Sequence, residues 1–305
     1  MRYVLGLDGG GTKTECVLMG EDGRVVSRGR SGPSNPNRVG FGGALASVSD
    51  AARLAIANAG IPALEVTALC AGLAGASHPE SAQRMKRLLE EEFPGKAVRV
   101  CMDLDLVLEG TGEGAAIVLI AGTGSAAVGR DAQGRAARVG GHGYLLGDEG
   151  SAYHLGQRAV RQALGHFERT GADTPLGQRI LAETGEPGWT ELQARINAGP
   201  DDVFPRLFPM VLYAAESGDA EARQLLEECA AALAGLVKDL AERLQLQSQK
   251  FLLARTGGML GRSGYFDERV DQHLHGAAPF AQFGELKLSP AEAAAHLAMQ
   301  LTPPA

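Results

Sequence analysis

One pattern occurs twice in this sequence, and it restricts the fold more than any other feature. Residues 3–28 and residues 115–139 each contain an apolar run, a glycine- and threonine-containing loop, a second apolar run, a turn with Asp and Gly-Arg, and a third run. Runs of this length and composition predict strands. A supersecondary unit that recurs predicts two similarly built α/β domains, 1–114 and 115–305, with a cleft between their glycine loops.

The first glycine loop, "LGLDGGGTKT" at residues 5–14, does not fit either common nucleotide-binding motif. A P-loop needs lysine directly after its last glycine and then a helix, but Thr12 follows Gly11 and the next apolar run is strand-like. The G-x-G-x-x-G motif fails because its third glycine would fall on Thr14. A glycine loop between antiparallel strands can still present backbone N–H groups to an anion. We therefore expect it to bind phosphate.

The residues around this loop suggest a metal and a second phosphate contact. Asp8 cannot face phosphate without repulsion, so we expect it to hold Mg²⁺ through water. The loop of the second copy is expected to grip the same polyphosphate. Lys13 either neutralises phosphate or is simply solvated. The predicted phosphate ligands are Gly9, Gly10, Gly11, Thr12, Lys13, Thr14, Gly122, Thr123, Gly124 and Ser125.

Composition excludes several classes of protein. The formal net charge of −7 over 305 residues gives no basic surface for nucleic acid. No apolar stretch reaches the roughly 20 residues of a membrane helix, and the first apolar run is too short for a signal peptide. We expect a cytoplasmic protein. The four cysteines form no C-x-x-C pair, and the three that lie in strand-like runs are interpreted as buried small residues.

Several motifs together resemble one family. "DGGGTKT", "AGTGS" and "TGGML" resemble the phosphate-1, phosphate-2 and adenosine motifs of the sugar kinase/actin/heat-shock chaperone superfamily. "GPSNPN", "AGLAGA", "IAGTGS" and "GGHGYLLGDEGSAY" resemble the N-acetylglucosamine kinase branch of the BadF/BadG/BcrA/BcrD ATPase family. The resemblance implies two ribonuclease-H-like (actin-like ATPase) domains, with ATP and Mg²⁺ bound in the cleft. It also implies that the last helix, 289–302, packs back on the first domain.

The same resemblance suggests residues for the nucleotide and for the general base. Gly257 and Gly258 would let the backbone pass close to adenine and ribose, or they form a simple turn. Phosphoryl transfer to a sugar hydroxyl needs a carboxylate that accepts the hydroxyl proton. The family's base aligns with Asp103, although Met102 replaces the Asn that usually precedes it. Asp105 is the alternative base, and capping of the following helix is a third interpretation.

For the acceptor sugar, the resemblance implies contacts from Asn35, His142 and Asp148. Each has another interpretation. Asn35 precedes proline and favours a turn, His142 is typical of an exposed loop, and Asp148 with Glu149 could stabilise the start of a helix through its dipole. Residues 166–215 carry no interpretable pattern.

The resulting hypothesis is an ATP-dependent amino-sugar kinase that converts N-acetylglucosamine to its 6-phosphate with an Asp base. A kinase for glucosamine or another hexose is one alternative. Another is an ATPase activator of a dehydratase or reductase, which needs cluster-binding cysteines that this spacing does not suggest. A sugar-sensing repressor would need an N-terminal DNA-binding helix pair. Partners are expected to be the sugar and ATP, with no nucleic acid and no membrane; a homodimer is left open.

Overall fold

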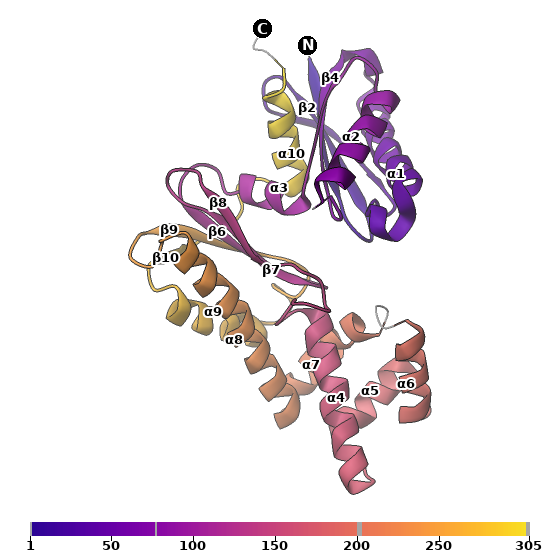
Figure 1. The fold of residues 1–305 in the computed structure, drawn as a ribbon, viewed down its shortest axis with the longest axis vertical. Coiled ribbons are helices and arrows are strands. Elements are labelled where there is room, and N and C mark those ends of the chain that lie inside the picture. The colour runs from indigo at the N-terminus through magenta and orange to yellow at the C-terminus, as the bar shows by residue number, and fades with distance from the viewer. Residues whose placement is uncertain (1, 77, 200–202, 303–305) are drawn as a thin grey trace. The chain divides into compact units, whose positions relative to one another are not determined.

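The computed structural model describes residues 2–76, 78–199 and 203–302, which fold into two compact units (Figure 1). The first unit takes the chain up to Glu113 and again from Leu286 onward, and the second unit runs from Gly114 to Glu285. The chain therefore leaves the first unit once, builds the whole second unit, and returns.

The first unit contains a mixed five-stranded sheet in the order β3-β2-β1-β4-β5. Strands β1 to β3 form an antiparallel meander, and β4 and β5 run parallel to β1. Its elements are β1 (Tyr3–Gly9), β2 (Thr14–Gly20), β3 (Val25–Ser31), α1 (Pro36–Ala59), the 3-10 turn η1 (Ala63–Glu65), β4 (Val66–Leu73), α2 (Pro79–Glu92), β5 (Ala97–Cys101), α3 (Asp103–Glu109) and α10 (Pro290–Met299).

The second unit repeats this sheet in the order β8-β7-β6-β9-β10. Strands β6 to β8 form the antiparallel meander, and β9 and β10 are the parallel additions. Its elements are β6 (Ala116–Ala121), β7 (Ser125–Arg130), β8 (Ala136–Gly140), α4 (Ala152–Thr170), α5 (Pro175–Thr184), α6 (Trp189–Ala198), η3 (Phe204–Arg206), α7 (Leu207–Glu216), α8 (Ala220–Arg243), β9 (Phe251–Thr256), α9 (Gly264–Ala277) and β10 (Ala281–Phe283). The predicted α/β class with two repeated domains is confirmed.

Helices cover both faces of the first sheet (Figure 1). Because side chains alternate along a strand, Leu5 and Leu7 point into a core formed with α1 and α2. Val4 lies in a separate core with α10 and α3. Gly6 lies on that second face, where an added Cβ would be 2.1 Å from the backbone nitrogen of Ala295. The backbone of α10 therefore lies directly on β1.

Local signals fix where α10 begins. The Ser289 side chain accepts from the backbone N–H of Glu292, and the Glu292 carboxylate accepts from the backbone N–H of Ser289, which is a capping box. Arg28 of β3 also forms an ion pair with Glu292, at 2.5 Å. The helix is thus anchored to the sheet at the end where the chain returns to the first unit.

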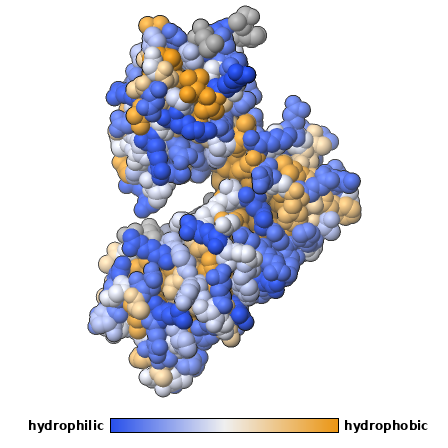
Figure 2. Space-filling model, turned by 180° about the vertical axis from the view of Figure 1, so that it is seen from behind, coloured by the Kyte–Doolittle hydropathy of each residue, from blue (hydrophilic) through white to orange (hydrophobic). Residues whose placement is uncertain are grey.

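The second unit has one extended core, to which α4, α7 and α8 contribute most of the helical residues. Helix α4 begins at Ser151, whose side chain accepts from the His154 N–H, and ends at Gly171 in the left-handed conformation. Among the described residues, no helix combines the length and the apolar character that spanning a bilayer requires. Hydrophilic residues interrupt the hydrophobic ones on the face of each unit shown in Figure 2.

Replacing Gly6 by Ala is expected to lower the free energy of unfolding by about 3 kcal/mol, because α10 must move away from β1 to admit the methyl group. Gly42 in α1 is the matched control, since a Cβ there meets nothing within 4 Å. Gly42→Ala should be neutral or stabilising by up to about 1 kcal/mol. Urea unfolding of both variants measures the difference. Equal stability of the two variants would contradict this packing.

Candidate active site

The first glycine loop is a tight turn at the tip of the β1–β2 hairpin. The Gly10 N–H donates to the Lys13 carbonyl at 2.9 Å, and Gly9 pairs with Thr14 where the strands meet. Within the described part of the chain, the N–H groups of Gly11 and Thr12 have no hydrogen-bond partner. These two donors at an exposed hairpin tip can bind an anion. Their contact with ATP remains a prediction.

The segment after β3 holds this loop in place. The Ser34 N–H donates to the Gly10 carbonyl at 3.0 Å. The Thr14 hydroxyl, which is fully buried, lies 2.8 Å from the Ser34 hydroxyl and donates to the Gly32 carbonyl at 2.8 Å. A Cβ on Gly9 would lie 2.2 Å from the Ser34 oxygen. The Thr14 hydroxyl is therefore already hydrogen-bonded within the protein, and its contact with a phosphate stays a prediction.

Acidic side chains gather beside the loop. The pKa of Asp8 is raised to about 6, mainly by burial and also by the charges of Asp103 and Glu15, while Lys13 partly opposes the shift. Lys13 itself pairs with Glu15 at 2.5 Å. The described residues contain no cluster of three or more side chains that could ligate a metal. Mg²⁺ needs only one or two protein carboxylates when phosphate and water supply its other ligands. Asp8 alone is therefore enough to hold Mg²⁺ beside a bound phosphate.

The two candidate bases have different local contacts. The Asp105 carboxylate accepts from the Met102 N–H at 3.1 Å and so caps α3. Asp103, the first residue of α3, is half-buried, accepts from the Leu104 N–H at 3.0 Å, and is close enough to Asp8 to raise its pKa. The charge of Asp103 thus acts on Asp8, and the Asp105 carboxylate caps α3; which of the two is the general base stays a prediction.

Asn35 has a local structural role next to the loop. Its side-chain oxygen accepts from the Asn37 N–H at 2.9 Å and caps α1. Gly75, with φ of 88°, lies against it, because an added Cβ would be 2.5 Å from the Asn35 oxygen. Asn35 is therefore fixed between the start of α1 and the turn after β4. Contact with the acceptor sugar stays a prediction.

In the second unit the structure brings the other two glycine motifs together. The N–H groups of Ala152 and Tyr153, at the start of α4, donate to the carbonyls of Gly122 and Thr123 at 2.9 and 3.3 Å. Gly257 has φ of 113°, and a Cβ there would lie 2.2 Å from the Ala121 carbonyl oxygen. The Gly257–Gly258 turn therefore crosses directly over the end of β6, beside the Gly122–Ser125 loop.

Asp148 ties the second glycine loop to the loop that precedes α4. It is buried, and the backbone N–H groups of Ser125 and Gly143 donate to its carboxylate. Burial is the largest effect on its pKa and raises it, while His142, which is exposed, lowers it. Its φ of 64° is unusual for a residue with a side chain, and such strain concentrates at functional sites. His142 and Asp148 thus share one loop, and sugar binding by either is still a prediction.

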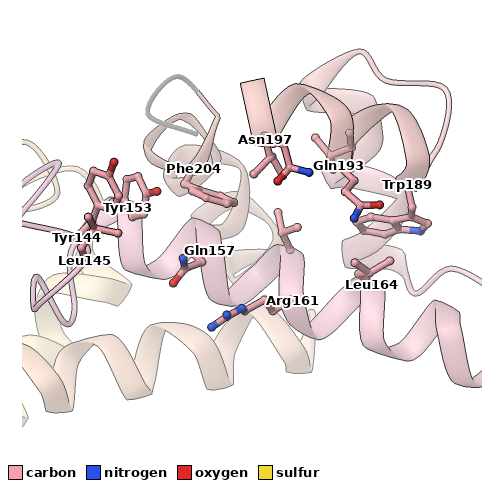
Figure 3. Close-up of a pocket in the computed structure, with 13 residues that line it drawn as sticks. Tyr144, Leu145, Tyr153, Gln157, Arg161, Leu164, Trp189, Gln193, Asn197 and Phe204 are labelled. Carbon is pink, nitrogen blue, oxygen red and sulfur yellow. The ribbon is translucent and has the colours of Figure 1, made fainter. Parts of the chain in front are cut away.

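Sequence reasoning missed a pocket of about 830 Å³ between α4 and α6 (Figure 3). Tyr144 stacks on Tyr153 at a ring distance of 4.3 Å at one end, and Trp189 lies at the other. The pocket is lined by Tyr144, Leu145, Tyr153, Gln157, Val160, Arg161, Leu164, Trp189, Leu192, Gln193, Ile196, Asn197 and Phe204. Six of these residues, from Trp189 to Phe204, lie within 166–215, the stretch in which the sequence showed no interpretable pattern.

Sequence reasoning also missed Arg38. A guanidinium nitrogen of Arg38 donates to the Gly11 carbonyl at the tip of the hairpin, at 3.3 Å. A basic residue in the third position of a helix gives no signal of its own, because its position depends on a loop 27 residues earlier.

Comparisons with known proteins show that the chain resembles kinases of amino sugars in sequence and fold. The profile of the BadF/BadG/BcrA/BcrD ATPase family matches residues 5–276. The chain is 31% identical to an N-acetylmuramic acid/N-acetylglucosamine kinase of Clostridium acetobutylicum, over 90% of this chain and 91% of that protein. It is 28% identical to an N-acetyl-D-glucosamine kinase of Dictyostelium discoideum, over 97% of both. A crystal structure from Chromobacterium violaceum, assigned as an N-acetylglucosamine kinase, superposes with a TM-score of 0.80 at 26% identity, over 99% of both chains.

Replacing Asp8 by Asn is expected to stabilise the protein above pH 6 when no ligand is bound. The native pKa of about 6 lies above the ordinary value of 3.8, so folding disfavours the ionised carboxylate. The wild type and the variant should therefore be equally stable below about pH 4, with the variant gaining as the pH rises through 6, by at most about 3 kcal/mol. Urea unfolding at pH 5 and pH 8 measures this gain.

Asp50, an exposed carboxylate of α1, provides the control for this pH series. Asp50→Asn should change stability by less than about 0.5 kcal/mol at either pH. If Asp8→Asn behaves like Asp50→Asn, then Asp8 is not held in the repulsive, buried environment described above.

Proposed function

The chain belongs to the BadF/BadG/BcrA/BcrD ATPase family and, like its relatives, is a sugar kinase; we propose that it transfers the terminal phosphoryl group of ATP to the 6-hydroxyl of N-acetylglucosamine. The observation that carries the proposal is that Asp103, at the start of α3, lies in the same unit as a phosphate-type hairpin loop and that its charge acts on Asp8. Phosphoryl transfer needs a phosphate-binding loop, a cation and a carboxylate at one place.

Asp103 is proposed as the general base. As the sugar oxygen attacks phosphorus and the bond to the leaving ADP oxygen breaks, the hydroxyl proton passes to the Asp103 carboxylate. Its backbone is fixed by α3, which Asp105 caps, so the carboxylate does not have to be ordered when the acceptor binds. Preorganisation of this kind lowers the entropic part of the barrier.

Asp8 is proposed to hold Mg²⁺ through water. When bound, the ion would neutralise charge on the phosphate oxygens. Asp8 sits at the end of β1, where burial and neighbouring carboxylates disfavour its own negative charge in the absence of a cation. That cost is relieved when a divalent cation arrives, which supports a metal at this position.

The remaining contacts are proposed for each unit separately. In the first unit the Gly11 and Thr12 N–H groups bind phosphate, and Asn35 contacts the sugar. In the second unit the Gly122–Ser125 loop and the Gly257–Gly258 turn bind ATP, and His142 and Asp148 contact the sugar. Support comes from the side-by-side position of the two glycine motifs in that unit. We also place the protein in the cytoplasm, where ATP is available.

Two alternatives differ in substrate or in reaction. Glucosamine or another hexose could replace N-acetylglucosamine through a few pocket contacts worth about 1–3 kcal/mol each. An ATPase activator that holds an iron–sulfur cluster is less well supported, because Cys16, Cys70 and Cys229 are buried within their own units. The kinase proposal therefore has the stronger structural basis.

A coupled ADP-release assay with Mg²⁺ and a panel of hexoses and amino sugars tests this function. N-acetylglucosamine should give the highest kcat/KM of the panel. Asp103→Asn should lower kcat by about 10²–10⁴-fold, because the general base is lost. Asp105→Asn is the matched control: it should weaken the cap of α3 by about 1 kcal/mol and leave most of the turnover.

Two results would contradict the proposal. If no sugar stimulates ADP release, the protein is not a sugar kinase. If Asp105→Asn abolishes turnover while Asp103→Asn does not, the base has been assigned to the wrong carboxylate.

A further inference from the structure

Arg38 lies at a place where a positive charge would meet a phosphate bound to the first glycine loop. Residues 36–39 form a single turn at the start of α1, separated from the rest of the helix by Gly40, whose φ of 70° and ψ of 168° are not helical. This short turn directs Arg38 to the hairpin tip. A Cβ added to Gly11 would lie 3.2 Å from the nearest guanidinium nitrogen of Arg38.

The loop's own lysine is already paired. Lys13 lies 2.5 Å from Glu15, and the neighbouring acidic residues are Asp8 and Asp103. Arg38, in contrast, forms no ion pair with any described residue, and the one hydrogen bond of its side chain is the donation to the Gly11 carbonyl. A guanidinium has five N–H donors in a planar fork that suits a phosphate, so at least four donors stay available at the tip.

The position of Arg38 also indicates which phosphate it would meet. The segment from Ser34 to Arg38 is hydrogen-bonded to the loop through Ser34 and Gly10, through Ser34 and Thr14, and through Arg38 and Gly11. The same segment carries Asn35, the proposed acceptor contact. The phosphate closest to the acceptor is the one that is transferred.

We infer that Arg38 binds the terminal phosphate of ATP and supplies the cation that Lys13, held by Glu15, does not supply. This inference rests on the proposed function, since it assumes that ATP binds at the first glycine loop. Arg38 keeps its bond to the Gly11 carbonyl and donates its other N–H groups to the phosphate oxygens. Because charge moves onto those oxygens during transfer, the contact raises kcat as well as ATP affinity.

The test is equilibrium binding of two nucleotides by calorimetry, each with Mg²⁺: a non-hydrolysable ATP analogue and ADP, which lacks the terminal phosphate. Arg38→Gln should lower the affinity for the ATP analogue by about tenfold, the usual effect of losing one charge-assisted pair. Its affinity for ADP should stay within about twofold. Arg38→Lys should fall between the wild type and Arg38→Gln, because it keeps the charge and loses the planar fork.

Arg24→Gln is the matched control, since Arg24 lies on the β2–β3 turn with 87% of its side chain exposed. It should change neither affinity. Thermal unfolding verifies that each variant folds. Three results would overturn the role of Arg38. Arg38→Gln could lower the affinity for both nucleotides equally, lower neither affinity, or change only the KM of the sugar.

The assay separates this inference from the proposed function. Selective loss of ATP-analogue binding, with no sugar able to stimulate ADP release, would support Arg38 as a phosphate ligand and reject the kinase proposal. Sugar-dependent ADP release in the wild type, with unchanged ATP-analogue binding in Arg38→Gln, would support the kinase proposal and reject Arg38 as a phosphate ligand.

Discussion

The contact between the β1–β2 hairpin tip and the segment that follows β3 determines the geometry of the first unit's site. Gly9 has no room for a side chain because Ser34 lies against it, and the buried Thr14 hydroxyl is shared with Ser34 and Gly32. These contacts turn a glycine-rich loop, which would otherwise be flexible, into a fixed concavity. Asp8, the free N–H groups and Arg38 all take their positions from it.

In the second unit the glycine loop is also held in place, but by different contacts. Its glycine loop is held by N–H groups at the start of α4, which bind the loop carbonyls, and by the buried Asp148 carboxylate, which accepts from Ser125 and Gly143. Both sheets share one topology. The same hairpin loop thus occurs in both units but is stabilised by different groups. Hydroxyl groups hold it in the first unit, and a helix terminus and a carboxylate hold it in the second.

The sequence was informative wherever the signal is local. Strand–loop–strand patterns, the Ser289–Glu292 capping box and the glycine motifs depend on neighbouring residues, and the sheets and α10 follow from them. Asp105 accepts from the Met102 N–H at the third position of α3, a cap that the sequence pattern allows but does not distinguish from a role as the base, so the assignment of the base to Asp103 stays a prediction. Arg38 and the pocket beside Trp189 depend on contacts between distant segments, which single-sequence patterns do not contain.

A kinase transfers the terminal phosphoryl group of ATP to a sugar oxygen and not to water, so the identity of the phosphorylated product distinguishes the two reactions. Phosphorus NMR of a reaction with ATP, Mg²⁺ and N-acetylglucosamine should show a phosphomonoester coupled to the protons on carbon 6, formed in equal amount to ADP. Inorganic phosphate as the sole product, at the same rate with or without sugar, would contradict the account.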